Sequence, residues 1–81
     1  MDFPCKFPIK IIGINSPSFV ADIERITRTH YPDIHIDSIR KQHSPQANYI
    51  SITVTVDALE QVTLDAIYRE LTQHPDIKMV L

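Results

Sequence analysis

Three residues near the start of the chain, Gly13, Asn15 and Ser16, have the types and spacing of a small anion-binding site. They join an apolar segment to one with helical spacing, and Ser16-Pro17 is a typical helix start. The first turn of a helix has unpaired N–H groups and a partial positive charge, which attract carboxylates. Gly13 permits close backbone approach, and the Asn15 amide can donate a hydrogen bond. We therefore predict this loop as the place for a small anionic metabolite; the alternative is a well-capped helix that binds nothing.

A second group of polar side chains alternates with apolar ones from residue 49 to residue 58. A period of two is typical of a strand with one buried face. The outward positions are uncharged: Tyr49, Ser51, Thr53 and Thr55. This pattern predicts an interaction face for a second copy of the chain, giving a homodimer, or for another protein. Bases of single-stranded RNA would stack on such a face too, but it offers one aromatic residue, so RNA binding ranks below protein binding.

No combination of residues in the sequence predicts catalysis. The single cysteine, Cys5, is too little for an iron–sulfur cluster or a paired-cysteine metal site. His35 and His43 would lie roughly 27 Å apart if they belong to one strand, too far to share an ion. The loop at 13–18 lacks the phosphate-binding arginine of an acylphosphatase-like hydrolase. The sequence therefore predicts no catalytic residue, no metal and no cofactor.

The candidate residues lie in a regular series of segments separated by prolines and polar clusters. Apolar alternation predicts strands over 7–14, 34–43, 49–58 and 76–81, and helical spacing predicts helices over 17–31 and 59–74. Gly13 is expected at a bulge or a close backbone approach, and Ile39, which breaks the alternation of its strand, at a bulge or twist. Leu59 and Val62 are expected to extend the apolar stripe of the second helix. In the last strand, Ile77, Met79 and Leu81 are expected on one face.

The order strand, helix, strand, strand, helix, strand predicts the α+β class and a ferredoxin-like βαββαβ sandwich. Right-handed crossovers place both helices on one face of a four-stranded antiparallel sheet. The other face stays open. We expect residues 1–81 to form one domain, because 81 residues are too few for two cores.

Composition limits the partners and the compartment. A formal net charge of −2 argues against binding to nucleic acid. One cysteine forms no internal disulfide, which argues against a small extracellular scaffold. No apolar run approaches the ~20 residues that span a bilayer, and the first residues do not have the pattern of a signal peptide. We therefore expect a cytoplasmic protein without a membrane partner.

Both ends of the sequence resemble one family of small bacterial proteins. Its opening motif is Phe3-Pro4-Cys5 with Phe7-Pro8-Ile9-Lys10, and its second half has Asn48-Tyr49, Tyr68-Arg69-Glu70-Leu71 and Lys78-Met79-Val80-Leu81. These motifs are similar to those of the YbeD-like family, although Ala47-Asn48 replaces the family's usual glycine before the tyrosine. The resemblance implies an ACT-like regulatory fold and a function that is not defined, and it implies no catalytic residues.

These observations favour a non-enzymatic regulatory or adaptor domain that associates with itself or with another protein. Two alternatives stay open. One is an ACT-type sensor of an amino acid or a carboxylate, which would use Gly13, Asn15 and Ser16. The other is an RNA-binding module, which would use the face that contains Tyr49.

Overall fold

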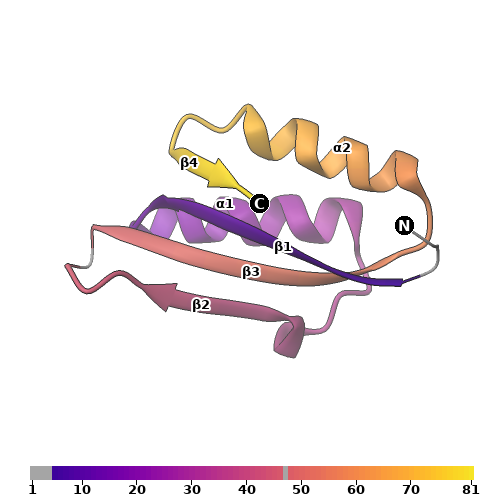
Figure 1. The fold of residues 1–81 in the computed structure, drawn as a ribbon, viewed down its shortest axis with the longest axis horizontal. Coiled ribbons are helices and arrows are strands. Elements are labelled where there is room, and N and C mark those ends of the chain that lie inside the picture. The colour runs from indigo at the N-terminus through magenta and orange to yellow at the C-terminus, as the bar shows by residue number, and fades with distance from the viewer. Residues whose placement is uncertain (1–4, 47) are drawn as a thin grey trace.

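The structure, a computed structural model, describes residues 5–46 and 48–81. Within these ranges the elements follow the predicted order of strands and helices (Figure 1). They are β1 (Cys5–Ile14), α1 (Pro17–His30), a short 3₁₀-helix η1 (Ile36–Ser38), β2 (Ile39–His43), β3 (Tyr49–Ala58), α2 (Gln61–Thr72) and β4 (Ile77–Val80).

The four strands form one sheet in the order β2-β3-β1-β4, and every neighbouring pair is antiparallel. Both helices pack on the same face of this sheet, and α1 lies behind the strands in the view of Figure 1. The ferredoxin-like α+β sandwich predicted from the sequence is therefore confirmed. β1 is central, as expected for a strand with apolar residues on both faces.

The core lies between the sheet and the helices. Alternate residues of β1 and β3 point into it, together with one stripe of each helix. Its buried apolar side chains are Ile9, Ile11, Phe19, Ile23, Ile26, Ile50, Ile52, Val54, Val56, Ala58, Leu64, Ile67 and Leu71. The predicted phase of β3 is confirmed, since its even-numbered residues from 50 to 58 are all buried.

The second strand is shorter than predicted. It begins at Ile39 instead of residue 34, because residues 36–38 form η1. The ring of His35 accepts a hydrogen bond from the Asp37 backbone N–H at 3.1 Å, and such local side-chain bonds compete with strand pairing. Ile36 is 68% exposed. The irregularity at Ile39 therefore marks the end of a 3₁₀ turn and not a bulge or twist within a long strand.

The second helix is shorter than predicted at both ends, and its apolar stripe does not extend to Leu59 or Val62. Leu59 precedes the helix and is 68% exposed, and Val62 is 66% exposed. Val62 precedes Leu64 by two residues, which places it about 200° around the helix and away from the core. Within the described ranges, no helix has the length and apolar content that crossing a bilayer would require.

The last strand does not keep the predicted alternation. Ile12 pairs with Met79 and Gly13 with Ile77, so Lys78 is an extra residue in β4. Because of this bulge, Ile77 and Val80 both pack against the core, while Met79 is 50% exposed. The prediction that Ile77, Met79 and Leu81 share a face was therefore wrong for Ile77.

Candidate functional site

The predicted loop is a capped helix start. The Ser16 side chain accepts a hydrogen bond from the Phe19 backbone N–H at 3.1 Å, and Pro17 is the first helical residue. The Asn15 backbone N–H donates to the carbonyl of Asn48 at 3.2 Å. This cap satisfies one of the free N–H groups that would otherwise attract an anion.

Gly13 is needed for packing within the chain itself. A Cβ at this position would clash with the ring of Phe19 and would lie 2.7 Å from the carbonyl oxygen of Asp76. The predicted close approach is confirmed, but the atoms that approach belong to α1 and to the turn before β4. Anion binding by Gly13, Asn15 and Ser16 stays a prediction.

The predicted interaction residues line one stripe of β3 on the face opposite the helices. Tyr49 is 43% exposed, and Ser51, Thr53 and Thr55 are half-buried between neighbouring strands. Paired residues of adjacent strands point to the same face, so the register gives the rest of this surface. It adds Lys6, Pro8, Lys10, Ile12 and Ile14 from β1, Arg40 and Gln42 from β2, and Met79 from β4. We call this surface the open face.

Two cations lie at the centre of the open face. Lys10 of β1 and Arg40 of β2 both pair with Thr53, one from each side. Neither forms an ion pair with another described residue, whereas Lys6 contacts Asp57 at 2.7 Å. Among the described residues that strand pairing assigns to it, the open face thus holds three cations and one carboxylate, in a chain with eight basic and ten acidic residues.

Exposed apolar side chains lie along one end of the open face and along its β4 edge. Among the described residues, four of the seven exposed large apolar side chains lie there: Ile14, Tyr49, Met79 and Leu81. Leu81 is next to Lys10, because their backbones exchange two hydrogen bonds of 2.8 and 3.1 Å. The contributions of Met79 and Leu81 could not be placed from the sequence, since the bulge in β4 decides which of its residues face outward.

A hollow of about 310 Å³ lies over the short side chain of Ser51. Longer neighbours surround it: Lys10, Ile12, Gln42 and Tyr49, with residues 43–45 of the turn after β2. Two of the predicted interaction residues, Tyr49 and Ser51, line this hollow. Thr53 and Thr55 lie further along β3.

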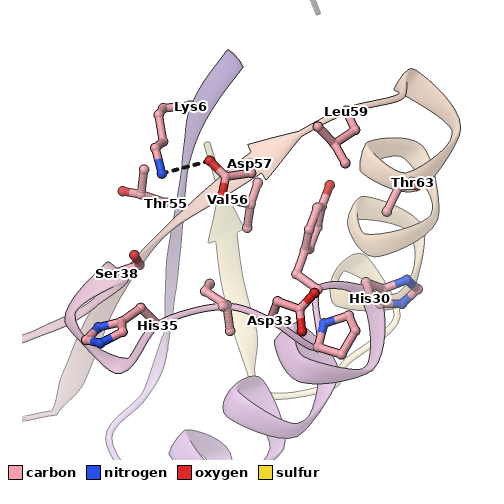
Figure 2. A pocket seen from close by; sticks show the side chains of 13 residues that line it. Lys6, His30, Asp33, His35, Ser38, Thr55, Val56, Asp57, Leu59 and Thr63 are labelled. Atoms are coloured by element: carbon pink, nitrogen blue, oxygen red, sulfur yellow. Dashed lines mark ion pairs between the residues drawn. The ribbon is translucent and has the colours of Figure 1, made fainter. Parts of the chain in front are cut away.

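A second cavity, of about 350 Å³, lies between the end of α1 and the ends of β3 and β1 (Figure 2). The Lys6–Asp57 ion pair lies on one side of it, and His30 and Asp33 lie across from them (Figure 2). Tyr31 also lines it, and its buried hydroxyl has no hydrogen-bond partner within the described part of the chain. Burial, with a smaller effect of Tyr68, raises the pKa of Tyr31. The sequence did not predict this cavity, which residues distant in sequence assemble.

Two histidines connect the helices. His30 of α1 lies 2.7 Å from the carboxylate of Glu70 of α2, and His74, which follows α2, lies 3.0 Å from Asp22 of α1. The hydrogen bond with His74 holds the pKa of Asp22 below its ordinary value. These histidines therefore serve helix packing. In the described ranges, no group of three histidine, cysteine or acidic side chains could hold a metal ion.

Comparison with known proteins assigns the chain to a family. A family model described as a protein of unknown function, DUF493, matches residues 1–81. A UPF0250 protein of Chromobacterium violaceum is 41% identical over 80 residues, which cover 99% of this chain and 90% of the relative. A UPF0250 protein of Paraburkholderia phymatum is 42% identical over 81 residues, or 100% and 91% of the two chains. One from Neisseria gonorrhoeae is 40% identical, over 100% and 89%.

The matches span the motifs that suggested the YbeD-like family. Of those motifs, Phe3-Pro4 and Ala47 lie outside the described residues. The others lie on β1, β3, α2 and β4, except that Asn48 directly precedes β3 and Leu81 directly follows β4. Neither the family description nor the names of these relatives contain an enzyme activity. The chain belongs to the DUF493 family, the YbeD-like proteins of unknown function.

Proposed function

We propose that this protein is a non-enzymatic adaptor that regulates a partner protein in the cytoplasm by binding it on the open face. The observation that carries the proposal is the combination found there: exposed apolar side chains, a hollow beside them, and two cations that form no ion pair with any residue of 5–46 and 48–81. Protein interfaces combine apolar contact residues with polar and charged ones. The hydroxyl groups of β3 can also hydrogen-bond to a partner.

The opposite side of the molecule, which the helices cover, supports the choice of the open face as the binding surface. Several of its charged side chains contact one another: Lys41 with Glu24 at 2.6 Å, Arg25 with Asp22 at 3.7 Å, and Asp22 with His74 at 3.0 Å. Exposed ion pairs of this kind are solvated and add little to binding. The open face differs because Lys10 and Arg40 are available to an incoming group.

Site-specific photo-cross-linking in the native host tests the proposal. A photoreactive residue at position 51 should give a partner adduct of one defined mass, which disappears when Met79→Arg is added. The same probe at Ala21, on the exposed side of α1, is the matched control. Equal adducts from positions 51 and 21, or adducts that survive Met79→Arg, would exclude the open face as the binding surface.

The cavity of Figure 2 favours a second candidate function, an ACT-type sensor of a small ligand. Its volume suits a small metabolite, and hydroxyl groups of Ser38, Thr55 and Thr63 line it. NMR titration with amino acids and short carboxylic acids separates the alternatives. Shifts at 30–38 and 55–63 would support the cavity, and shifts confined to 13–19 would support the loop predicted from the sequence. No shift with any of these compounds would remove the sensor function.

A further inference from the structure

We infer that the partner segment which binds the open face is acidic and carries one large apolar side chain. This inference rests on the proposed function and adds the chemistry of the partner. It depends on the positions of Lys10 and Arg40, on the hollow over Ser51, and on the excess of basic over acidic side chains among the described residues of the open face.

The first step is the placement of the two cations. Their backbones lie two strands apart, or roughly 10 Å, with the short side chain of Thr53 between them. Both are exposed, and neither has a carboxylate partner among the residues that the structure describes. Two carboxylates of one extended segment that crosses the sheet can reach them together. Complementary charges of this kind favour the correct partner and accelerate its association.

The second step is the hollow. It lies beside the pair of cations, since Ser51 is two residues before Thr53 on the same face of β3 and pairs with Ile12 and Gln42. It is an open depression of about 310 Å³, over which an aromatic or long aliphatic side chain of a partner can lie. Lys10 lines it too, so the apolar side chain and the acidic groups of the partner lie close together.

The same charges argue against two other occupants. A second copy that binds face to face would bring two surfaces with an excess of basic groups together, and like charges in contact are costly. A single-stranded nucleic acid needs several stacking platforms, and Tyr49 is the one aromatic side chain among the described residues of this face. An acidic protein segment fits both the charge and the hollow.

Selection from a display library of random peptides tests the inference. Peptides of about 12 residues extend to roughly 40 Å and can cover the 38 Å length of the molecule. Enriched peptides should be acidic and carry one aromatic or aliphatic anchor. Their affinity should fall about tenfold or more with Lys10→Glu/Arg40→Glu, since this reverses both contacts. It should also fall with Ser51→Tyr, which fills the hollow.

Matched controls separate this effect from a general change of charge or shape. Arg28→Glu/Arg69→Glu changes the net charge equally on the exposed surface of the helices, and Ala21→Tyr adds the same ring on α1. Neither should weaken binding. Circular dichroism of each variant confirms that it is folded.

The remaining results of the selection distinguish failure of the acidic partner from failure of the proposed function. Peptides that lose affinity with Ser51→Tyr but are neutral or basic, or that tolerate Lys10→Glu/Arg40→Glu, overturn the acidic partner and leave the proposed function intact. No enrichment, or enrichment that tolerates Ser51→Tyr, counts against both. Binding of an oligouridine that is lost with Lys10→Glu/Arg40→Glu, without binding of acidic peptides, replaces the protein partner by single-stranded RNA.

Discussion

Gly13 lies where three parts of the chain meet: β1, the ring of Phe19 at the start of α1, and the carbonyl of Asp76 before β4. Because Gly13 has no side chain, the ring of Phe19 and the backbone of Asp76 can both pack against β1 at this end of the sheet. The sequence predicted a close approach at this glycine, because an isolated glycine within a strand pattern has few other uses. It could not show that Phe19 fills the space, since that contact depends on the tertiary arrangement.

We expect Gly13→Ala to destabilise the protein by about 1–3 kcal/mol, as is usual when a methyl group is forced into a filled space. Chemical denaturation measures the change in the free energy of unfolding. Adding Phe19→Leu shortens the opposing side chain, so the double variant should lose less than the sum of the two single losses. Additive losses would show that the ring of Phe19 does not limit position 13.

The elements illustrate which parts of the fold a sequence determines. β3 was predicted correctly because every second residue over ten positions is apolar, and α1 because Ser16-Pro17 and Tyr31-Pro32 mark its ends. β2 and β4 were predicted less well. A 3₁₀ turn replaces the start of the predicted second strand, and a bulge at Lys78 reverses the facing of β4. Neither the 3₁₀ turn nor the bulge produces a periodic pattern of apolar residues, so the pattern of the sequence could not predict them.

Neighbouring residues of β3 provide a test of its two faces. Val54→Asp should cost about 4 kcal/mol or more, because it buries a charge without a partner. Since a small domain has about 5 kcal/mol in total, this variant should be largely unfolded at room temperature. Thr53→Asp places the same group between Lys10 and Arg40 and should leave the melting temperature nearly unchanged. Equal losses would contradict the assignment of the faces.

The contact between Asp22 and His74 predicts how stability depends on pH. The pKa of Asp22 is lowered from 3.8 mainly because its carboxylate bonds to His74. Its folded-state pKa is thus below its unfolded value, so its contribution is present above pH 3.8 and is lost as pH falls through the folded value.

Asp22→Asn should therefore remove part of the loss of stability between about pH 5 and pH 2. Denaturation at a series of pH values measures it. Asp65→Asn is the control, because Asp65 is an exposed acidic residue of α2 whose carboxylate accepts a hydrogen bond from the side-chain amide of Gln61 at 2.9 Å. A profile for Asp22→Asn that coincides with the unchanged protein would exclude this contact as a source of acid sensitivity.

At the scale of the whole molecule, the charges of the described residues are distributed unevenly over the surface. The open face has an excess of basic groups, although the chain as a whole is acidic. This arrangement could not be predicted from the net charge, because it depends on which residues of β1 and β2 point outward. The pattern of β3 correctly predicted which of its residues point away from the core. It predicted neither the cations beside Thr53 nor the exposed apolar side chains of Met79 and Leu81.

We expect the homodimer predicted from the sequence to be weak, to form at high micromolar concentration, and to strengthen with salt. Its apolar end favours association, while Lys10 and Arg40 of two copies repel each other until salt screens them. Sedimentation velocity at low and high salt measures this. A protein that remains monomeric at millimolar concentration in both conditions does not form the dimer.

β1 lies in the middle of the sheet, yet one of its two partners, β4, has only four residues and comes last in the sequence. Until β4 is in place, the edge of β1 beside Ile11 and Ile12 is an unpaired, β-branched template of the kind that nucleates aggregation. By pairing with β1, the short strand β4 covers this edge and blocks its pairing with another chain. A chain that ends after residue 75 should form sedimenting aggregates that bind thioflavin T, whereas the full chain stays in the supernatant. β4 therefore protects the partly folded chain from aggregation and also stabilises the native fold.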